Sequence, residues 1–577
     1  MRQKFRSMHI VTVKKTVGEK TYASHLLRRS YRDGGKVKTE TLANLSNLPD
    51  DMVEALRGLL KGHALVPAGE AIENTSSKLH GHVQAVLKAF ERLGFASLVS
   101  STPSRERDLV LAMVAARVLL PDSKLATARR WHDTTLPEEL GVTDATEDEL
   151  YAALDWLLGR QARIERKLVK RHLASGDFAL YDLSSSYVEG THCPLARLGY
   201  SRDGKRGTLQ INYGLLTAPS GIPVAMTLFP GNTTDSTTVL GQVDKLRGYG
   251  LSEFVLVGDR GMLSAKQIDE LRGQPGIHWI TAVRTDGLRE LVKTGPVQLG
   301  LFDEMNLRAF THPEFPGERL VACFNPLLAR KRAYKREDML RATREELDKV
   351  ARMVAAGKLV GKARIGVRVG KTVNKYLMAK HLVLTIEDAA FSYALNDESI
   401  RAEAALDGVY VIRTNLPAAR LSDEDAVRSY KLLTGVERAF RTMKGFDLQI
   451  RPIYHHLEDR VRAHFFLCML AYYVEWHMRE AWRSLLFADE EQEAKRGRDP
   501  VAPAQRSVSA IAKTRTGKLS DETPAHSFRS LLGHLSTIVR NECRTAATSP
   551  ATTFTMTTIA NTKQAEALRL LDQIQSA

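Results

Sequence analysis

The chain of 577 residues has a globular composition, 43% hydrophobic and 26% charged, which excludes a disordered or collagen-like protein. Its formal net charge of +16 points to a polyanionic partner and says nothing about the fold. The excess lies in residues 1–60, 326–364, 428–451 and 495–518, which carry +6, +7, +4 and +6. Solvated helix faces would explain any one stretch, but four around a slightly acidic remainder favour nucleic acid.

The positions of the cysteines and the lengths of the apolar segments indicate the cellular compartment of the protein. The four cysteines are far apart and form no CxxC pair, which argues against a disulfide framework or a zinc ribbon. The basic start lacks the apolar segment of a signal peptide, and the longest apolar run, near 465–474, is too short to span a bilayer. We therefore expect a cytoplasmic protein with no membrane partner.

The sequence of the N-terminal third indicates a region of strands followed by a helical region. Residues 8–47 read as short strands with a tight turn at Asp33-Gly34-Gly35. From about 77 to 173, apolar residues recur at helical spacing. This helical, partly basic stretch has room for a helix-turn-helix, although no sharp motif marks one. We accordingly assign 1–75 to a β-hairpin and helix region and 76–175 to a helical DNA-binding domain.

The pattern then changes to that of an α/β sheet. Strands are predicted at 178–181, 207–216, 222–229, 254–257 and 278–283, with helices at 236–248 and 264–272. Three consecutive strands followed by helix-strand alternation describe a sheet with an antiparallel and a parallel side.

Residues 285–408 interrupt this sheet. They contain a long basic helix near 327–355, and apolar β-branched pieces at 365–369 and 381–386 that we predict as strands. Sheet character returns at 409–412. The remainder is predicted to be a helical segment at 424–482 with a turn near 451, a basic linker, and helices near 527–540 and 563–575.

Three carboxylates stand out. Asp182 and Asp259 each follow an apolar run, at the sheet edge where ligands bind in open α/β folds. Strand-end aspartates are also common turn formers, which is the simpler explanation for either residue alone. If the strands are neighbours, the two carboxylates converge and provide oxygen ligands for a hard cation such as Mg²⁺.

The third acid is Glu437. Positions 430, 434, 437, 441 and 444 are spaced by three and four residues, so in one helix they would share a face. Glu437 could instead be a surface residue paired with Arg441. The basic residues on the same predicted face favour a role for Glu437 as a metal ligand bordered by phosphate contacts.

These motifs resemble those of a DDE transposase of a bacterial insertion sequence, in the branch with a Tyr-x2-Arg-x3-Glu-x6-Lys signature. The matching segments are Tyr181–Ser186, Gly231–Asp235, Val257–Met262 and the stretch from Tyr430 to Lys444. The resemblance covers most of residues 20–480. It departs at Leu433, where that branch has arginine, and Arg438 or Arg441 could take over the missing phosphate contact.

The resemblance implies an α/β fold with a ribonuclease H-like core, a mixed sheet flanked by helices. Asp182 would lie on its first strand, Asp259 on its fourth and Glu437 on a late helix. The implied division is a first core part at 176–284, a β-rich insertion domain at 285–408, a second core part with the glutamate helix at 409–487, and a basic linker with a helical tail at 488–577.

The resemblance also implies the chemistry. Asp182, Asp259 and Glu437 would be the catalytic residues and would hold two Mg²⁺ ions, which Mn²⁺ can replace, for phosphodiester hydrolysis and joining of the freed 3′-OH to target DNA. The implied partners are double-stranded DNA, both the terminal inverted repeats and the target, and a second copy of the chain, on the bacterial nucleoid. Candidate DNA-phosphate contacts are Tyr430, Arg438, Arg441, Lys444, Arg260, Lys205 and Arg206.

Other functions remain as alternatives. One is a catalytically silent DNA-binding protein derived from a transposase, and another is a ribonuclease H-like nuclease without strand transfer. Gly366–Thr372 ends like a P-loop but has three residues between its glycines where four are needed. His455, His456 and His464 lack a metal-site spacing, and helix-end or phosphate contacts suit them better.

Overall fold

The computed structural model describes residues 8–17, 20–62, 72–190, 192–293, 306–491, 497–502, 504–545 and 552–575. Residues 492–496 and 503 of the predicted basic linker lie outside the described residues. The chain forms two compact units, one of residues 1–79 with 538–559 and one of residues 80–537 with 560–577.

In its described residues, the first unit contains two small antiparallel sheets. One consists of β1 (Met8–Val17), β2 (Lys20–Asp33) and β3 (Lys36–Asn44), followed by α1 (Asp50–Leu60). Gly34 and Gly35 take positive φ angles of 57° and 80°, which confirms the predicted tight turn. The other consists of β4 (Ile72–Leu79), β16 (Val539–Thr545) and β17 (Thr553–Thr557). This sheet was not predicted, and the strand β16 includes residues expected to end a helix.

The second unit begins with the predicted helical region. Its elements are α2 (Gly81–Arg92), α3 (Phe95–Val99), α4 (Arg105–Leu119), α5 (Lys124–Arg130), η2 (Trp131–Asp133), α6 (Leu136–Glu139), α7 (Glu147–Leu158) and α8 (Gln161–His172). Helices α2, α4 and α7 pack against α17 (Glu458–Ala481), which is buried along most of its length. A helix that is apolar on every face belongs in such a core. Within the described residues, no helix is long and apolar enough to cross a membrane.

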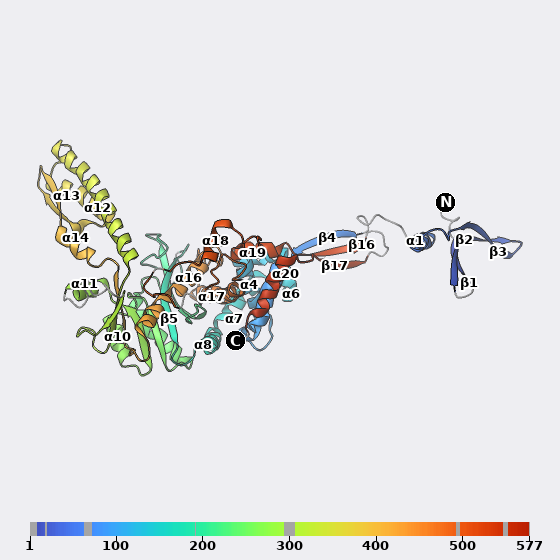
Figure 1. The fold of residues 1–577 in the computed structure, drawn as a ribbon, viewed down its shortest axis with the longest axis horizontal. Helices are drawn as coiled ribbons and strands as arrows, with labels where there is room; N and C mark the ends of the chain where they lie inside the picture. Colours follow the sequence, from blue (N-terminus) through green and yellow to red (C-terminus); the bar gives the residue numbers. More distant parts are fainter. Residues whose placement is uncertain are drawn as a thin grey trace. The chain divides into compact units, whose positions relative to one another are not determined.

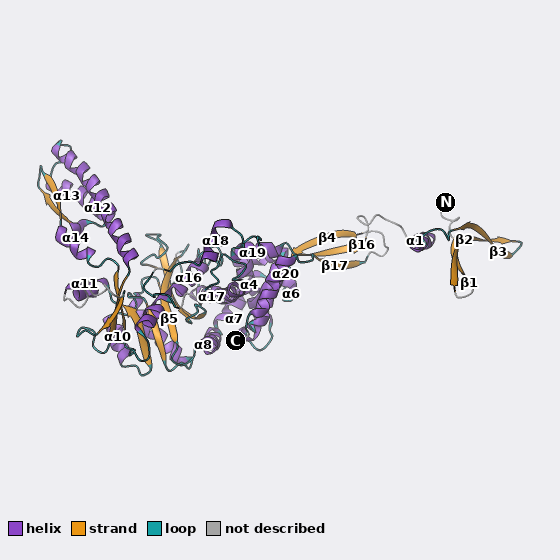
Figure 2. Ribbon diagram, viewed as in Figure 1, coloured by secondary structure: helices purple, strands orange, loops and turns teal. Residues whose placement is uncertain are grey.

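The central sheet of this unit is mixed (Figure 2). Its strands are β5 (Phe178–Tyr187), β6 (Arg197–Leu198), β7 (Leu209–Thr217), β8 (Pro223–Pro230), β9 (Phe254–Gly258), β10 (Ile277–Ala282), β11 (Leu307–Phe310), β12 (Arg319–Phe324) and β15 (Val409–Thr414). In the described residues the order is β11-β12-β15-β10-β9-β5-β7-β6, with β8 also on β7. Strands β5, β9 and β10 are parallel and the other pairings antiparallel. The predicted mixture of antiparallel and parallel pairing is confirmed, but the parallel strands lie in the middle of the sheet and antiparallel strands flank them on both sides, because β15, β12 and β11 extend the sheet beyond β10.

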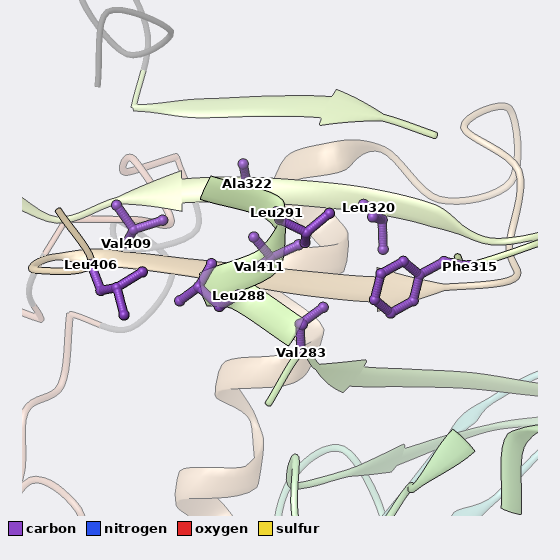
Figure 3. Packing of buried hydrophobic residues seen from close by; sticks show 9 residues of the cluster. All are labelled: Val283, Leu288, Leu291, Phe315, Leu320, Ala322, Leu406, Val409 and Val411. Carbon is purple, nitrogen blue, oxygen red and sulfur yellow. The ribbon is translucent and has the colours of Figure 1, made fainter. Parts of the chain in front are cut away.

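Helices connect these strands, and a hydrophobic cluster anchors the far edge of the sheet. The connections are η3 (Asp235–Thr238), α9 (Val239–Gly248), α10 (Ala265–Arg272) and α11 (Thr285–Lys293). Figure 3 shows Leu288 and Leu291 of α11 packed with residues of β12 and β15, among them Leu320 and Val411. These four side chains are at most 7% exposed, so the cluster fixes the strands that extend the sheet beyond β10.

The interrupting segment differs from the prediction. Besides α11 and the sheet strands β11 and β12, its described part contains α12 (Pro326–Ala355), α13 (Lys362–Tyr376), η5 (Ala379–His381), β13 (Leu382–Ile386), β14 (Phe391–Leu395) and α14 (Asp397–Ala404). The sheet is therefore not interrupted over all of 285–408, because β11 and β12 pair into it next to β15. The expectation of a β-rich segment was wrong, because helices dominate its described part. The strand expected at 365–369 is also helical: Ile365 and Val369, one turn apart, are buried in the core between α12 and α13, while Val367 is 61% exposed.

The predicted helical stretch before α17 is divided. It forms α15 (Asp423–Lys431) and α16 (Leu433–Lys444), which meet at Leu432. Positions 430 and 437 therefore do not share the face of one continuous helix. The chain continues after α17 with α18 (Val508–Thr516), α19 (Phe528–Ser536), α20 (Thr562–Leu570) and η7 (Leu571–Gln573).

Candidate active site

Two of the three carboxylates come directly after paired residues of the neighbouring strands β5 and β9. In the parallel pairing of β5 with β9, Tyr181 is opposite Gly258, so Asp182 and Asp259 are the next residues of the two strands. β9 ends at this point, whereas β5 continues to Tyr187 paired with β7. Asp182 is therefore inside its strand, not at its end as predicted, at the position where the pairing with β9 stops.

Asp182 has an unfavourable environment for a negative charge. Burial raises its pKa to about 7, and the charges of Asp259 and Glu437 act in the same direction. The N–H of Leu183 donates to Asp182 Oδ1 at 2.8 Å, and this bond and the charge of Arg202 oppose the increase. The negative charges of both other acids therefore act on Asp182, and little positive charge is nearby to balance them.

Glu437 comes from α16, which packs against β5 (Figure 1). The buried face of α16 includes Val436, Ala439, Phe440 and Met443, and this apolar face orients the helix so that Glu437 is exposed. The side chain of Glu437 forms no hydrogen bond or ion pair with any residue that the structure describes, including the side chain of Arg441. The alternative of a Glu437–Arg441 surface pair is therefore not what the structure contains.

Tyr430 contacts the second carboxylate. Its hydroxyl donates to Asp259 Oδ1 at 2.7 Å from the end of α15. Burial and the adjacent charge of Asp259 raise the pKa of Tyr430, so the phenol stays protonated as the donor. The hydrogen bond holds one oxygen of an otherwise exposed aspartate in place.

The donor chemistry of this edge suits a divalent cation. Carboxylate oxygens are the ligands that Mg²⁺ prefers, and a cation would balance the charges that disfavour ionised Asp182. Among the residues that the structure describes, no three His, Cys, Asp or Glu side chains are close enough together to hold a metal as they stand. The carboxylates fit by type and charge, and they are not assembled as a closed cage.

A family model described as a transposase DDE domain matches residues 181–474, which begin one residue before Asp182 and include Asp259 and Glu437. The chain belongs to this family. A second model, described as the N-terminal domain of IS1634 family transposases, matches residues 10–69. Together the two matches show that the protein is a DDE transposase of an insertion sequence. No curated protein gave a significant match.

The candidate phosphate contacts of the transposase fall into two groups. Lys444 pairs with Asp203 at 3.0 Å, and Lys205 lies over the ring of Tyr187 at 3.6 Å and 4.0 Å from Glu189. The remaining cations are exposed and form no ion pair with the described residues: Arg206, Arg260, Arg438 and Arg441. These four are open to an anionic partner, whereas the two lysines already have protein contacts.

Several supporting residues of the transposase were not predicted. Arg202, which acts on Asp182, is held by Asp235 through two bonds of 2.6 Å. Asp203, whose side chain is 2% exposed, binds both Lys444 and Arg451. Asp235 lies in the Gly231–Asp235 motif, so the sequence could have identified it as a site residue. Arg202 and Asp203 lie in a polar turn that matches no motif, so the sequence could not.

Two glycines allow close packing beside the site. The ring of Tyr181 crosses Gly214, where an added Cβ would lie 2.2 Å from the tyrosine oxygen. That oxygen donates to Thr238 at 2.9 Å. At Gly231 a Cβ would lie 2.0 Å from the carbonyl oxygen of Gln210. Larger residues at these positions would displace the strands next to Asp182.

Proposed function

We propose that the transposase cleaves phosphodiester bonds at the ends of its element and joins the freed 3′-OH ends to target DNA, with Asp182, Asp259 and Glu437 as the catalytic residues. The supporting observation is the register that places Asp182 and Asp259 directly after paired residues of neighbouring strands, together with the effect of Glu437 on the pKa of Asp182. A carboxylate whose pKa is raised by burial and by two neighbouring carboxylates is characteristic of a functional site rather than of a stabilising one.

The proposed cofactor is a pair of Mg²⁺ ions, for which Mn²⁺ can substitute, held by the three carboxylates. When bound, two such ions lower the pKa of an attacking water and stabilise the departing 3′ oxygen. The chain's own contribution is orientation. The N–H of Leu183 fixes Asp182 Oδ1, and the hydroxyl of Tyr430 fixes Asp259 Oδ1.

DNA binding is proposed to depend on the exposed cations around this edge. Arg438 and Arg441 lie on the same helix as Glu437, and Arg260 directly follows Asp259. Arginine binds phosphate oxygens through two parallel N–H groups, so these residues suit the strand being cut. Arg206, Lys205, Lys444 and Tyr430 would add contacts on the same DNA, and we expect affinity to decrease steeply with salt.

We further propose the division into domains that the resemblance implies. The order β8-β7-β5-β9-β10 supports a ribonuclease H-like core at 176–284 and 409–487, with β5 first and β9 fourth among its long strands. Residues 285–408 would be the insertion domain, 1–75 and 76–175 would hold the element ends, and 488–577 would be linker and tail. Activity on paired ends would require a homodimer, acting on the nucleoid in the bacterial cytoplasm.

A strand-transfer assay tests this proposal. The full chain is incubated with labelled duplexes carrying the inverted repeats that flank its gene, a target plasmid and Mg²⁺. We expect a nick that leaves a 3′-OH at the repeat, followed by covalent joining, and no product when a chelator removes the metal. Cleavage of unrelated duplexes without joining would instead identify a nuclease, and binding without cleavage a silent DNA-binding protein.

A further inference from the structure

A cationic pocket lies apart from the three carboxylates, in the same unit. It has a volume of about 320 Å³ and is formed by residues of α4, α5, α7 and α17 and by residues 449–455, the segment after α16. Its lining includes Arg117, Lys124, Arg451, Tyr454, His455 and His464. The side chain of Tyr454 is 62% exposed, whereas Lys124 and His464 are 4% and 6% exposed. The pocket therefore combines a solvent-exposed rim with a buried basic floor.

The positive charges of the floor lack carboxylate partners. Arg117 donates to the carbonyl oxygens of Asp122 at 2.8 Å and Leu448 at 3.4 Å, and neither Arg117 nor Lys124 forms an ion pair with a described residue. The carboxylate of Asp122, also in the lining, accepts from Arg130 at 2.9 Å and from the N–H of Ser123 at 2.8 Å. Its charge is therefore already compensated outside the floor.

The neighbouring groups show the effect of this imbalance. Burial and the charge of Arg117 lower the pKa of Lys124 to about 7. Burial and the charges of Lys124 and Arg117 lower the pKa of His455 to about 4. Buried cations are normally paired, because an isolated charge in the interior is costly. A cluster without an internal counterion suggests that the anion comes from outside.

A histidine on the floor has an unused polar atom. The Nε2 of His464 donates to the carbonyl oxygen of Ile450 at 3.1 Å. Its Nδ1 is buried and has no hydrogen-bond partner among the described residues. Buried polar atoms are usually satisfied. Burial and the charges of Lys124 and Arg117 hold the pKa of His464 well below its usual value. A bound anion would oppose this decrease, so that Nδ1 can take up a proton and donate to it.

We propose that this pocket binds one phosphate group, with Arg117 and Lys124 as its charged ligands and His464 as a third donor. The inference rests on the proposed function in one respect, because it takes the phosphate to be a backbone phosphodiester of bound DNA. Two contacts link the pocket to the cleavage site. Arg451 of the lining pairs with Asp203, and Asp203 also holds Lys444 at the end of α16. A free nucleotide or inorganic phosphate shares the same chemistry.

The test compares two full-length variants that each remove one positive charge from α5. Lys124→Gln removes the buried charge, and Arg129→Gln removes an exposed charge outside the pocket lining. Without phosphate, Lys124→Gln should unfold at the same temperature as the wild type or higher, since it removes an unpaired buried charge. Inorganic phosphate should raise the unfolding temperature of the wild type and of Arg129→Gln, and not that of Lys124→Gln.

Duplex binding across a salt series separates the two sources of phosphate. For Lys124→Gln we expect about tenfold weaker binding of end DNA, and a slope of log affinity against log salt that is smaller by about 0.9, the contribution of one phosphate. If Lys124→Gln loses the response to inorganic phosphate but binds DNA as the wild type does, the ligand of the pocket is a free phosphate or nucleotide and not DNA. If Lys124→Gln matches the wild type both in its response to inorganic phosphate and in DNA binding, the proposal that this pocket binds phosphate is wrong. If the wild type neither binds nor cuts end DNA, the proposed function fails, and the inorganic phosphate titration still decides the pocket.

Discussion

Replacing Asp203 with asparagine should loosen the segment that follows α16. Asp203 Oδ1 lies 3.0 Å from Lys444 Nζ and 2.7 Å from an Nη atom of Arg451, so one carboxylate neutralises two cations. The side chains of Asp203 and Lys444 are 2% and 11% exposed, so water cannot readily replace the lost partner. Burial lowers the pKa of Lys444, and the charge of Asp203 opposes that decrease.

The expected cost follows from this burial. Removing one partner of a buried ion pair costs about 3–5 kcal/mol. Arg451 is 28% exposed and keeps part of its hydration, so we take the lower end, about 3 kcal/mol. Since 1.4 kcal/mol corresponds to a factor of ten, amides of residues 441–451 should lose roughly hundredfold protection in hydrogen exchange.

Lys444→Met is the matched comparison for this prediction. It leaves Asp203 paired with Arg451, so the carboxylate keeps a counterion, and the cost should be about 1 kcal/mol or less. The two variants therefore differ in exchange rate by more than tenfold if the carboxylate is the shared anchor. Equal effects of the two substitutions, or unchanged exchange in Asp203→Asn, would refute the reasoning.

Two further substitutions probe the site. Tyr430→Phe removes the hydrogen bond to Asp259, and because hydrogen bonds to charged groups contribute about 1.5–3 kcal/mol, single-turnover cleavage should slow by roughly ten- to hundredfold while DNA binding is retained; an unchanged rate would contradict this. Gly214→Ala places a Cβ 2.2 Å from the oxygen of Tyr181 and should destabilise the fold by about 1–3 kcal/mol in urea unfolding. Gly241→Ala, in α9 with no atom within 4 Å of its Cβ, should be neutral or stabilising, and equal losses in both glycine variants would count against close packing at Gly214.

The parts of the fold that were predicted correctly are encoded in local patterns. The apolar runs before Asp182 and Asp259 are central strands, and the strands at 207–216 and 222–229 pair around a turn with Gly221 at a φ of +87°. Such runs and turns depend on a few adjacent residues. The proximity of Asp182 and Asp259 could be expected as soon as their strands were neighbours.

The missed features depend on partners that are distant in sequence. β4 pairs with β16, which comes near the other end of the chain, and neither strand has a marked apolar alternation. Asp203 acquires its role only when α16 and residue 451 pack beside it. At 365–369 the alternation of β-branched residues predicted a strand. The segment is instead a helix, because Ile365 and Val369, four residues apart, pack together against α12.

The central claim is most directly tested by cleavage of end DNA with Asp182→Asn in the full-length transposase. The variant keeps the size of the side chain and removes its charge, and Asp244→Asn, on the exposed side of α9, is the matched control. In single-turnover reactions with Mg²⁺, we predict that Asp182→Asn binds end DNA like the wild type and cuts it at least about a thousandfold more slowly, while Asp244→Asn cuts normally. Cleavage by Asp182→Asn at the wild-type rate would contradict the assignment of the catalytic site.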